Sequence, residues 1–454
     1  MVITALAILT AVAIEFSYRS RVEARLAANA RDQLRAYYLA RSAVNLSRLV
    51  LHFQRQVDAI QIPNLGPMLS GMLGGGAGGM MGGMGGMGAG MPGMPPGLAS
   101  AGGGSLHIRL WDVIPVDSGT LQLFIGPPEP SLDDSFGAPV GGTAGVPPPP
   151  APEPIGPSSP AGTVFKLTGP NRAFGDFDGS FHASVSDEES KINVNALNQL
   201  SALAAATSME MLTLMHWKDQ KYDFLFQDDE LHRQVRREDV LINIHDWIDP
   251  DTSTSNFDPL LLTSFTDPFT AGFGDEDDFY QRQDPRYRAK NAPIDTVDEL
   301  FMIHGITDRF MAAFGKRLTV YSAPNSLLNV NTDDPAQQLT NILVSLDTTR
   351  DPAVVQQLLG SPMLLQTILT ELQMMRMFSF VGLSVQSFVA VLAANGLPVN
   401  PFLTTPGSPN AFLGDTSSTF TIHAVGQVGE VESRLTAVVR YDDNLGRVLY
   451  WRED

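Results

Sequence analysis

Two short acidic segments hold the residues with the most distinctive chemistry in this sequence. They are Asp246–Asp251 and Gly274–Asp278. Carboxylates gathered from two segments can hold Ca²⁺, which takes six to eight oxygen ligands. Their spacing does not match an EF-hand loop, and the same acids could instead cap helices and pair with Arg286, Arg288 and Lys290. From the local residues alone, both interpretations stay open.

The other reactive residues form no catalytic pattern. The chain has no Cys, and its eight His residues include no i, i+4 pair and no HExxH motif. No GxSxG or Walker A sequence occurs either. Val297–Ile306 has the outline of a helix-hairpin-helix, but a net charge of −19 opposes nucleic-acid binding. We therefore expect a structural or binding protein without enzymatic activity, nucleic-acid partner or small-molecule substrate.

The N-terminus predicts a membrane-associated helix. Met1–Phe16 is apolar except for Glu15, and Arg19 follows as an aqueous boundary. The residues expected to contact the membrane are Val2, Ile3, Leu6, Ile8, Leu9, Val12 and Ile14. The apolar part of this segment is shorter than the ~20 residues that span a bilayer. We expect further residues, including a leader, to precede Met1.

The same helix continues without a Gly or Pro as far as Ala59. Its second half carries an apolar stripe with alternating spacings of three and four residues, which predicts one amphipathic helix that packs on another surface. The stripe consists of Ala36, Leu39, Ala43, Leu46, Val50, Phe53 and Val57. Pro63 and Gly66 end the helix.

The rest of the chain alternates between strand and helix patterns. Strands are expected at 106–113, 120–125, 164–167 and 179–185, and again at 419–427, 431–441 and 447–451. Helical patterns dominate 195–318 and 335–395, including helices at 238–248, 297–304 and 307–314. Two similar Asn-rich phrases, Lys191–Asn195 and Leu328–Thr332, precede helices, and Asn195 is expected to be an N-cap.

These patterns predict an α+β fold in which an all-α domain is inserted into a helix-and-sheet domain. The expected segments are an assembly helix at 1–60, a disordered Gly/Met-rich insertion at 61–104 and the first part of the α/β domain at 105–194, with a Pro-rich linker at 137–162. The inserted all-α domain spans 195–325, and 326–454 completes the α/β domain with C-terminal antiparallel strands.

Several phrases together resemble one known family. They are Ala36–Ala40, Lys191–Asn195, Asp246–Asp251, the acidic run after Gly274 with Tyr280, and Leu328–Asn331. In this order they resemble the minor pseudopilin K family of the type II secretion system, over most of the chain outside 64–162. The resemblance implies a pilin-like body on a long N-terminal helix, packed on an antiparallel sheet and carrying a large all-α insertion.

The resemblance also implies a location and partners. Such proteins cap the tip of the periplasmic pseudopilus with the minor pseudopilins I and J and support the export of folded proteins. The implied location is the bacterial inner membrane, crossed once, with the body in the periplasm. Residues 36–57 would then pack against helices of the partners. An alternative function is an envelope module that recognises exported substrate or the outer-membrane channel through the inserted domain.

The resemblance finally favours calcium at the acidic segments. Carried over by position, the candidate ligands are Asp249, Asp251, Asp275, Glu276 and Asp277.

Overall fold

The computed structural model describes residues 2–59, 107–125, 179–199, 201–216, 221–226, 235–323, 326–348, 350–351, 353–376, 381–404, 412–442 and 446–454. The predicted insertion at 61–104, the Pro-rich linker at 137–162 and the predicted strand at 164–167 lie outside these residues.

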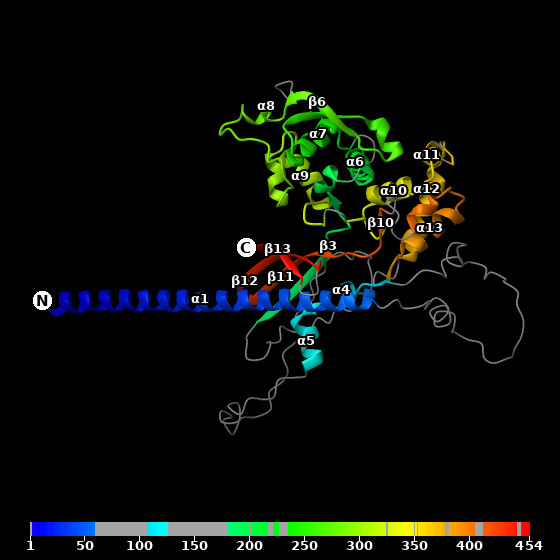
Figure 1. Cartoon of the computed structure of the whole chain (residues 1–454). Coiled ribbons are helices and arrows are strands. Elements are labelled where there is room, and N and C mark those ends of the chain that lie inside the picture. The colour runs from blue at the N-terminus through cyan, green and yellow to red at the C-terminus, as the bar shows by residue number, and fades with distance from the viewer. Residues whose placement is uncertain are drawn as a thin grey trace, which may run out of the picture.

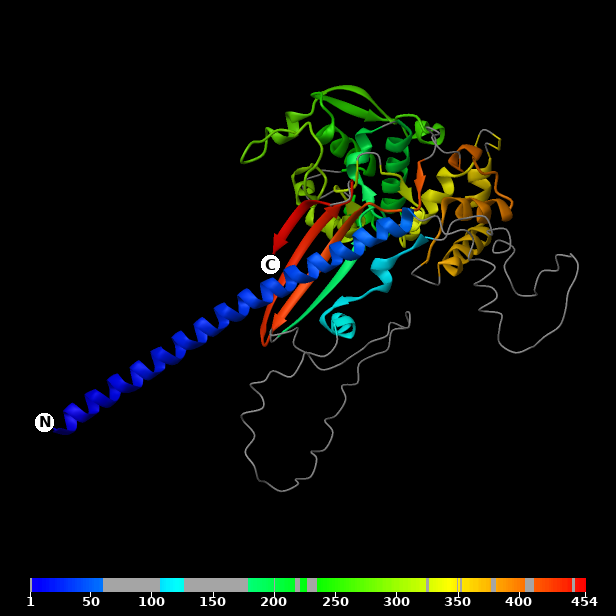
Figure 2. The ribbon, with the colours of Figure 1, turned by 60° about the horizontal axis from the view of Figure 1, so that its bottom comes forward.

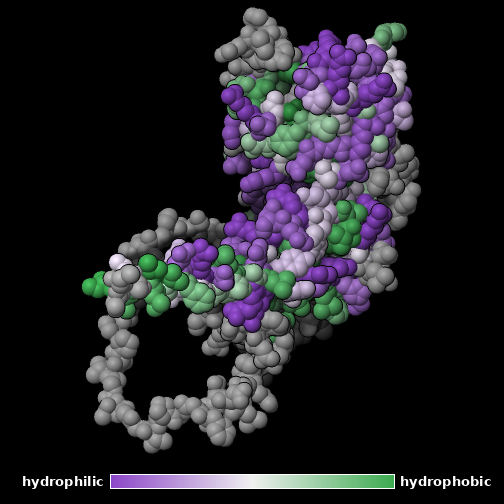
Figure 3. Space-filling view, turned by 90° about the vertical axis from the view of Figure 1, so that its left-hand side faces the viewer, coloured by the Kyte–Doolittle hydropathy of each residue, from purple (hydrophilic) through white to green (hydrophobic). Residues whose placement is uncertain are grey.

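One helix, α1, runs from Val2 to Ala59 over 58 residues, as the sequence predicts. Its N-terminal half projects away from the body, and its C-terminal half crosses a sheet (Figure 1, Figure 2). The projecting half exposes the apolar side chains of Ile3, Leu6, Ile8, Leu9, Val12, Ile14 and Phe16. Figure 3 shows hydrophobic side chains on this projecting rod, at the left of the view. Among the described residues, no helix combines the length and apolarity that crossing a membrane requires.

The sheet under α1 has five strands in the order β13-β12-β11-β3-β2, and every neighbouring pair is antiparallel. The strands are β2 (Val116–Asp117), β3 (Ser180–Asp187), β11 (Thr419–Val428), β12 (Val431–Arg440) and β13 (Arg447–Glu453). Apolar residues alternate along β11 and β12 toward α1, so that Ile422, Ala424 and Ala437 are buried under the helix. This helix-on-sheet arrangement confirms the predicted fold class.

The apolar stripe of α1 faces the chain's own sheet. Ala36, Leu39 and Ala43 are at most 3% exposed and belong to the same core as the strands. Leu46 and Val50 pack on the edge of that core. The prediction that these residues pack on partner helices is therefore wrong, because the sheet already covers them. Phe53 is 48% exposed, and Val57 is half-buried, so the structure leaves the prediction open for these two.

The expected strands at 106–113 and 120–125 are mostly helical. The segment contains β1 (His107–Ile108), α4 (Leu110–Val113) and α5 (Ser118–Ile125). Asp117 accepts hydrogen bonds from the backbone N–H and the hydroxyl of Thr120, at 2.6 and 3.1 Å. This capping bond starts a helix where the alternation of apolar residues predicted a strand.

A first helical region follows β3. Its helices are η2 (Val194–Asn198), α6 (Ser201–His216), η3 (Asp223–Leu225), α7 (Arg237–Ile248), η4 (Pro259–Ser264), α8 (Asp277–Tyr280), η5 (Val297–Met302), α9 (Asp308–Phe314) and η6 (Gly315–Arg317). They surround a core that includes Leu241, Trp247 and Phe310. The predicted helices at 238–248 and 307–314 are confirmed, and that at 297–304 is a 3₁₀-helix.

This region also contains strands that the helical pattern missed. Antiparallel β5 (Ser253–Phe257) and β6 (Phe269–Asp275) form a hairpin. Parallel β4 (Ile192–Asn193) and β7 (Leu318–Thr319) join its two ends. Because β4 and β7 lie far apart in the sequence, no local periodicity indicates that they pair.

A second helical region has a core of its own, which includes Ile342, Phe388 and Leu392. Its helices are α10 (Pro335–Val344), α11 (Val354–Leu359), α12 (Pro362–Met375), α13 (Val385–Ala394) and η7 (Pro401–Thr404). Its short strands are β8 (Leu328–Asn329), which pairs in parallel with β10 (Leu413–Gly414), and β9 (Val381–Gly382), which pairs with β1. In Figure 1 the first helical region lies above the sheet, and the second lies toward the end of α1 opposite its free end.

Candidate metal centre

One side of the candidate centre is the C-terminus of α7. The apolar residues of α7 pack into the first core and bury His245, Asp246 and Asp249 with them. Asp249 is the C-cap, and the helix ends there because a residue before proline avoids the helical conformation. The next turn carries Asp251 at the surface. The C-terminal end of α7 thus carries two buried acids, Asp246 and Asp249, and one exposed acid, Asp251.

The other side is the junction between β6 and α8. Glu276 lies between the last residue of β6 and the first of α8 and is 6% exposed. The ring of Tyr280 in α8 meets the ring of Trp247 in α7 edge-on, with centroids 5.3 Å apart. This aromatic contact brings together the two acidic segments, which β5 and β6 separate in the sequence.

The structure assembles three of the candidate ligands. One carboxylate oxygen from each of Asp249, Asp251 and Glu276 lies within 4.8 Å of the others. One oxygen of Asp249 and both oxygens of Glu276 are buried and accept no hydrogen bond from the described residues. The side-chain oxygen of Asn291 is also buried and accepts no hydrogen bond from the described residues. The side-chain nitrogen of Asn291 donates to the backbone carbonyl of Asp251.

These carboxylates destabilise one another in the absence of a compensating positive charge. Burial, and then the nearby Asp249 and Asp246, raise the pKa of Glu276 to about 9. Burial also raises the pKa of Asp249 to about 6, although His245 opposes the rise. Buried carboxylates with open acceptor sites fit a cation, because a cation would satisfy both the charge and the lone pairs.

The donor set suits a hard cation. Asp249, Asp251 and Glu276 offer oxygen ligands only, the chemistry that Ca²⁺ takes. A second group shares Asp249 and consists of His245, Asp246 and Asp249. There the Nδ1 atom of His245 is 3.3 Å from a carboxylate oxygen of Asp249 and 3.1 Å from the hydroxyl of Ser255. His245 therefore already has partners, and the all-oxygen group is the better candidate.

Two of the predicted ligands have other roles. Asp275 accepts a hydrogen bond from the backbone N–H of Asp277 at 2.9 Å. Asp277 accepts from the backbone N–H of Ala289 at 2.9 Å and lies 3.6 Å from Arg288. Neither belongs to a described metal-binding group, so the structure does not place them as ligands. The capping and pairing alternative holds for these two acids, while Lys290 pairs with Asp295 and Glu299 instead.

The sequence did not single out Asn291 as part of this centre. Asn291 has a positive φ of 50°, a conformation that Asn tolerates better than most residues. Only this backbone geometry turns its side chain toward the loop of Asp251. An Asn in a basic stretch gives no such indication in the sequence.

The comparisons with known proteins agree with the family resemblance. The long helix on an antiparallel sheet is the arrangement that the resemblance implies. Residues 262–323, which include Glu276, match the family model described as "Type II secretion system (T2SS), protein K". The match supports the resemblance inferred from the sequence over this segment.

Other comparisons add less. No curated protein matches this chain. Among solved structures, a chain of the GspK-GspI-GspJ complex from the enterotoxigenic Escherichia coli type 2 secretion system is similar at 17% identity. The match covers 63% of this chain and 84% of that chain with a TM-score of 0.38.

Proposed function

We propose that this chain is a minor pseudopilin K that caps the tip of the type II secretion pseudopilus with the minor pseudopilins I and J. The cap would support export of folded proteins across the outer membrane. The observation that carries the proposal is the division of α1 into a half packed on its own sheet and a half that projects with bare apolar residues.

The bare half of α1 favours association with other helices. Leu26 and Leu34 are 62% and 57% exposed, beyond the part of α1 that the sheet covers. Burying apolar surface contributes about 25 cal/mol per Å², before the cost of association. Two broad helical regions at the opposite end of the molecule leave little room for another subunit to continue the stack there (Figure 2), which favours a terminal position.

Charge substitutions on the bare half test the assembly. Leu26→Asp and Leu34→Asp should reduce co-purification with I and J at least tenfold, because a carboxylate would be buried between helices. Gln33→Asp adds the same charge beside Leu34 and is the matched control. Unchanged melting temperatures would show that the body is intact. Normal complex formation by both Leu variants would contradict the proposal.

We further propose that the projecting helix holds the protein in the inner membrane before assembly, with the body in the periplasm. The exposed Ile3, Leu6, Leu9 and Phe16 support this location. Membrane fractionation of cells that express the chain tests it, and recovery of all the protein in the soluble periplasmic fraction would refute it.

We propose that Ca²⁺ binds Asp249, Asp251 and Glu276, where it would neutralise the carboxylates and join α7 to the β6–α8 junction. Saturating Ca²⁺ at 100 times its Kd should add about 2.7 kcal/mol to the free energy of unfolding. A chelator should therefore lower the melting temperature of the native chain, and added Ca²⁺ should restore it.

Two variants sharpen the calcium test. Glu276→Gln should abolish the response to Ca²⁺, whereas Asp278→Asn, which removes an exposed acid two residues away, should retain it. If chelator leaves the melting curve of the native chain unchanged, the carboxylates serve another purpose.

A further inference from the structure

The long helix α1 is basic, although the chain as a whole is acidic. It contains eight Arg and four acidic residues, so that it carries a net charge of +4, whereas the other residues of the chain total −23. All eight arginines follow the apolar N-terminal segment, and Arg19 is the first of them. The projecting half of α1 therefore joins an apolar end to a basic stretch, a combination that an anionic membrane surface attracts.

Two arginines of the projecting half have no carboxylate partner. Arg21 and Arg25 are exposed and form no ion pair with any residue that the structure describes. They lie four residues apart, so they are neighbours on one face of the helix. Glu23 does not offset them, because residues two apart in a helix do not face each other. Like charges at this spacing repel each other, and an external anion would relieve the repulsion.

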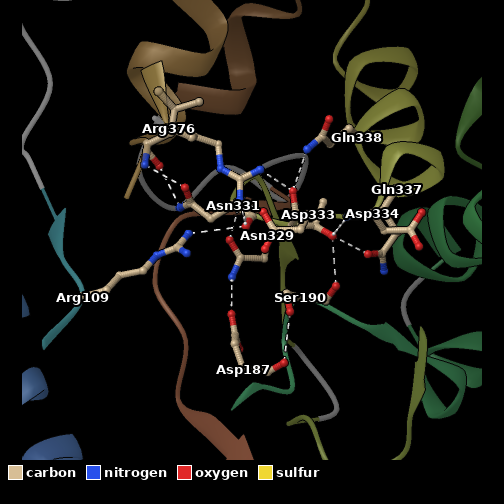
Figure 4. Close-up of polar contacts among 12 residues, drawn as sticks. Arg109, Asp187, Ser190, Asn329, Asn331, Asp333, Asp334, Gln337, Gln338 and Arg376 are labelled. Carbon is tan, nitrogen blue, oxygen red and sulfur yellow. Dashed lines mark hydrogen bonds and ion pairs between the residues drawn. The ribbon is translucent and has the colours of Figure 1, made fainter. Parts of the chain in front are cut away.

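Other arginines of the molecule are held by carboxylates of the chain itself. Arg19 lies 2.6 Å from Glu15 and offsets its charge at the edge of the apolar segment. In the body, Arg376 pairs with Asp333 in the loop that precedes α10 (Figure 4). The two arginines of the projecting half differ from these, because their charge faces only the surroundings of the chain.

The order of residues along α1 matches the layers of a membrane surface. The apolar segment ends at the exposed Phe16, and the exposed Tyr18 follows. Aromatic rings favour the boundary between the hydrocarbon and the headgroups. At 1.5 Å per residue, Arg21 lies about 7.5 Å beyond Phe16, and the headgroup layer is about 5–8 Å thick. With Phe16 at the edge of the hydrocarbon, Arg21 would therefore lie at the level of the lipid phosphates.

Arg25 reaches toward the same level. It lies about 6 Å further along the helix than Arg21. The Cα–Cβ bonds of an α-helix tilt toward its N-terminus, and a long Arg side chain extends its charged end toward polar groups several ångströms away. Since the N-terminus of α1 is the apolar end, both side chains leave the helix in the direction of the membrane.

We propose that Arg21 and Arg25 bind the phosphate groups of anionic phospholipids at the surface of the membrane that holds the projecting helix. This inference rests on the membrane location proposed above. Arginine binds phosphate through paired, charge-assisted hydrogen bonds. An anionic lipid fits better than an acidic partner protein, because the two arginines directly follow the apolar segment. Leu26 and Leu34, the residues proposed to pack on partner helices, lie beyond them in α1.

Flotation of the full-length chain with phospholipid vesicles tests the proposal. One set of vesicles is pure phosphatidylcholine, and the other contains about 30% phosphatidylglycerol. The partition coefficient should be at least about tenfold higher for the anionic vesicles, and added salt should reduce this preference because it screens exposed charges. Equal partition into both sets would overturn the proposal and leave the membrane location intact. Failure to bind either set would contradict the membrane location as well.

Matched variants locate the lipid contact. Arg21→Gln and Arg25→Gln should each reduce the preference for anionic vesicles about fivefold, the effect of removing one arginine from an anionic surface. Arg41→Gln removes an exposed arginine from the half of α1 that packs on the sheet, and should change the preference less than twofold. All three positions are exposed, so the variants should fold normally.

Two outcomes would overturn the assignment. An equal loss in Arg41→Gln would mean unspecific charge attraction along the helix. If Arg21→Gln kept its preference for anionic vesicles but no longer co-purified with I and J, the arginines would bind an acidic partner protein instead.

Discussion

At the scale of single residues, the two Asn-rich phrases show what the sequence could and could not reveal. The sequence predicted capping, but Asn193, not Asn195, accepts from the N–H of Asn195 and caps η2. The amide of Asn195 instead donates to the carbonyls of Ile294 and Val320, each at 3.0 Å. In the second phrase, Asn331 likewise donates to the carbonyls of Leu383 and Asp415. A capping hydrogen bond joins residues that are close in sequence, so the sequence can predict it. Hydrogen bonds to carbonyls far away in the sequence depend on the assembled fold.

Glu210 is another residue whose environment the sequence could not predict. It lies in α6, is 4% exposed, and borders a small cavity of about 20 Å³ together with Lys191, Glu189 and Gln337. Burial, and to a smaller extent Asp334, raise the pKa of Glu210 to about 8. A Glu in a helical pattern is ordinarily a surface residue, and only the packing of α6 between two cores buries this one.

The pKa of Glu210 predicts how stability depends on pH. An unfolded Glu releases its proton near pH 4.3, so between about pH 4.3 and 8 the folded chain holds a proton that the unfolded chain has lost. The contribution of Glu210 to stability therefore falls as pH rises through this range. Glu210→Gln cannot ionise, and its melting temperature relative to the native chain should rise between pH 5 and pH 8.5.

Thermal unfolding at a series of pH values measures this difference. The exposed Glu430→Gln should run parallel to the native chain over the same range. A constant offset between Glu210→Gln and the native chain at all pH values would show that Glu210 ionises normally.

At the scale of elements, the packing of α1 on the sheet depends on close approach. A Cβ atom at Gly426 in β11 would lie 2.1 Å from the carbonyl oxygen of Ala36 and 2.5 Å from the backbone nitrogen of Ala40. Helix and strand backbones thus meet with no space for a side chain. The periodicity of α1 predicted a packed face, but identical periodicity would arise from packing on a partner, so the sequence could not identify the sheet as the surface.

This contact predicts the effect of adding a single methyl group at position 426. Gly426→Ala should push α1 away from β11 and lower the free energy of unfolding by about 1–3 kcal/mol, because both clashing groups are backbone atoms. Urea unfolding measures the change. Gln427→Ala, at the exposed neighbouring position, should cost less than about 0.5 kcal/mol. Equal stability of Gly426→Ala and the native chain would mean that α1 shifts on the sheet without cost.

At the scale of the whole molecule, three cores meet at the Asn329–Asp334 loop. Arg376, at the end of α12, donates to the carbonyls of Asn331 and Thr332 at 2.8 and 2.6 Å and pairs with Asp333. Asn329 in the same loop donates to Asp187 of β3, which belongs to the sheet. The order of helices and strands that the sequence predicts gives the parts of the molecule, but this polar junction, built from loops, determines how the second helical region is attached.

The junction predicts that this region can be loosened on its own. Arg376→Gln removes charge-assisted bonds to two carbonyls, each worth about 1.5–3 kcal/mol, while the apolar core around Phe388 and Leu392 stays intact. Amide hydrogen exchange should then accelerate at least about tenfold in α12 and in the Asn329–Asp334 loop, with protection in β11 and β12 unchanged. The exposed Arg434→Gln, which breaks only a surface pair with Glu432, should alter neither. If exchange accelerated equally in β11 and β12, the sheet and the second helical region would unfold as one unit and the loop would not be a separable junction.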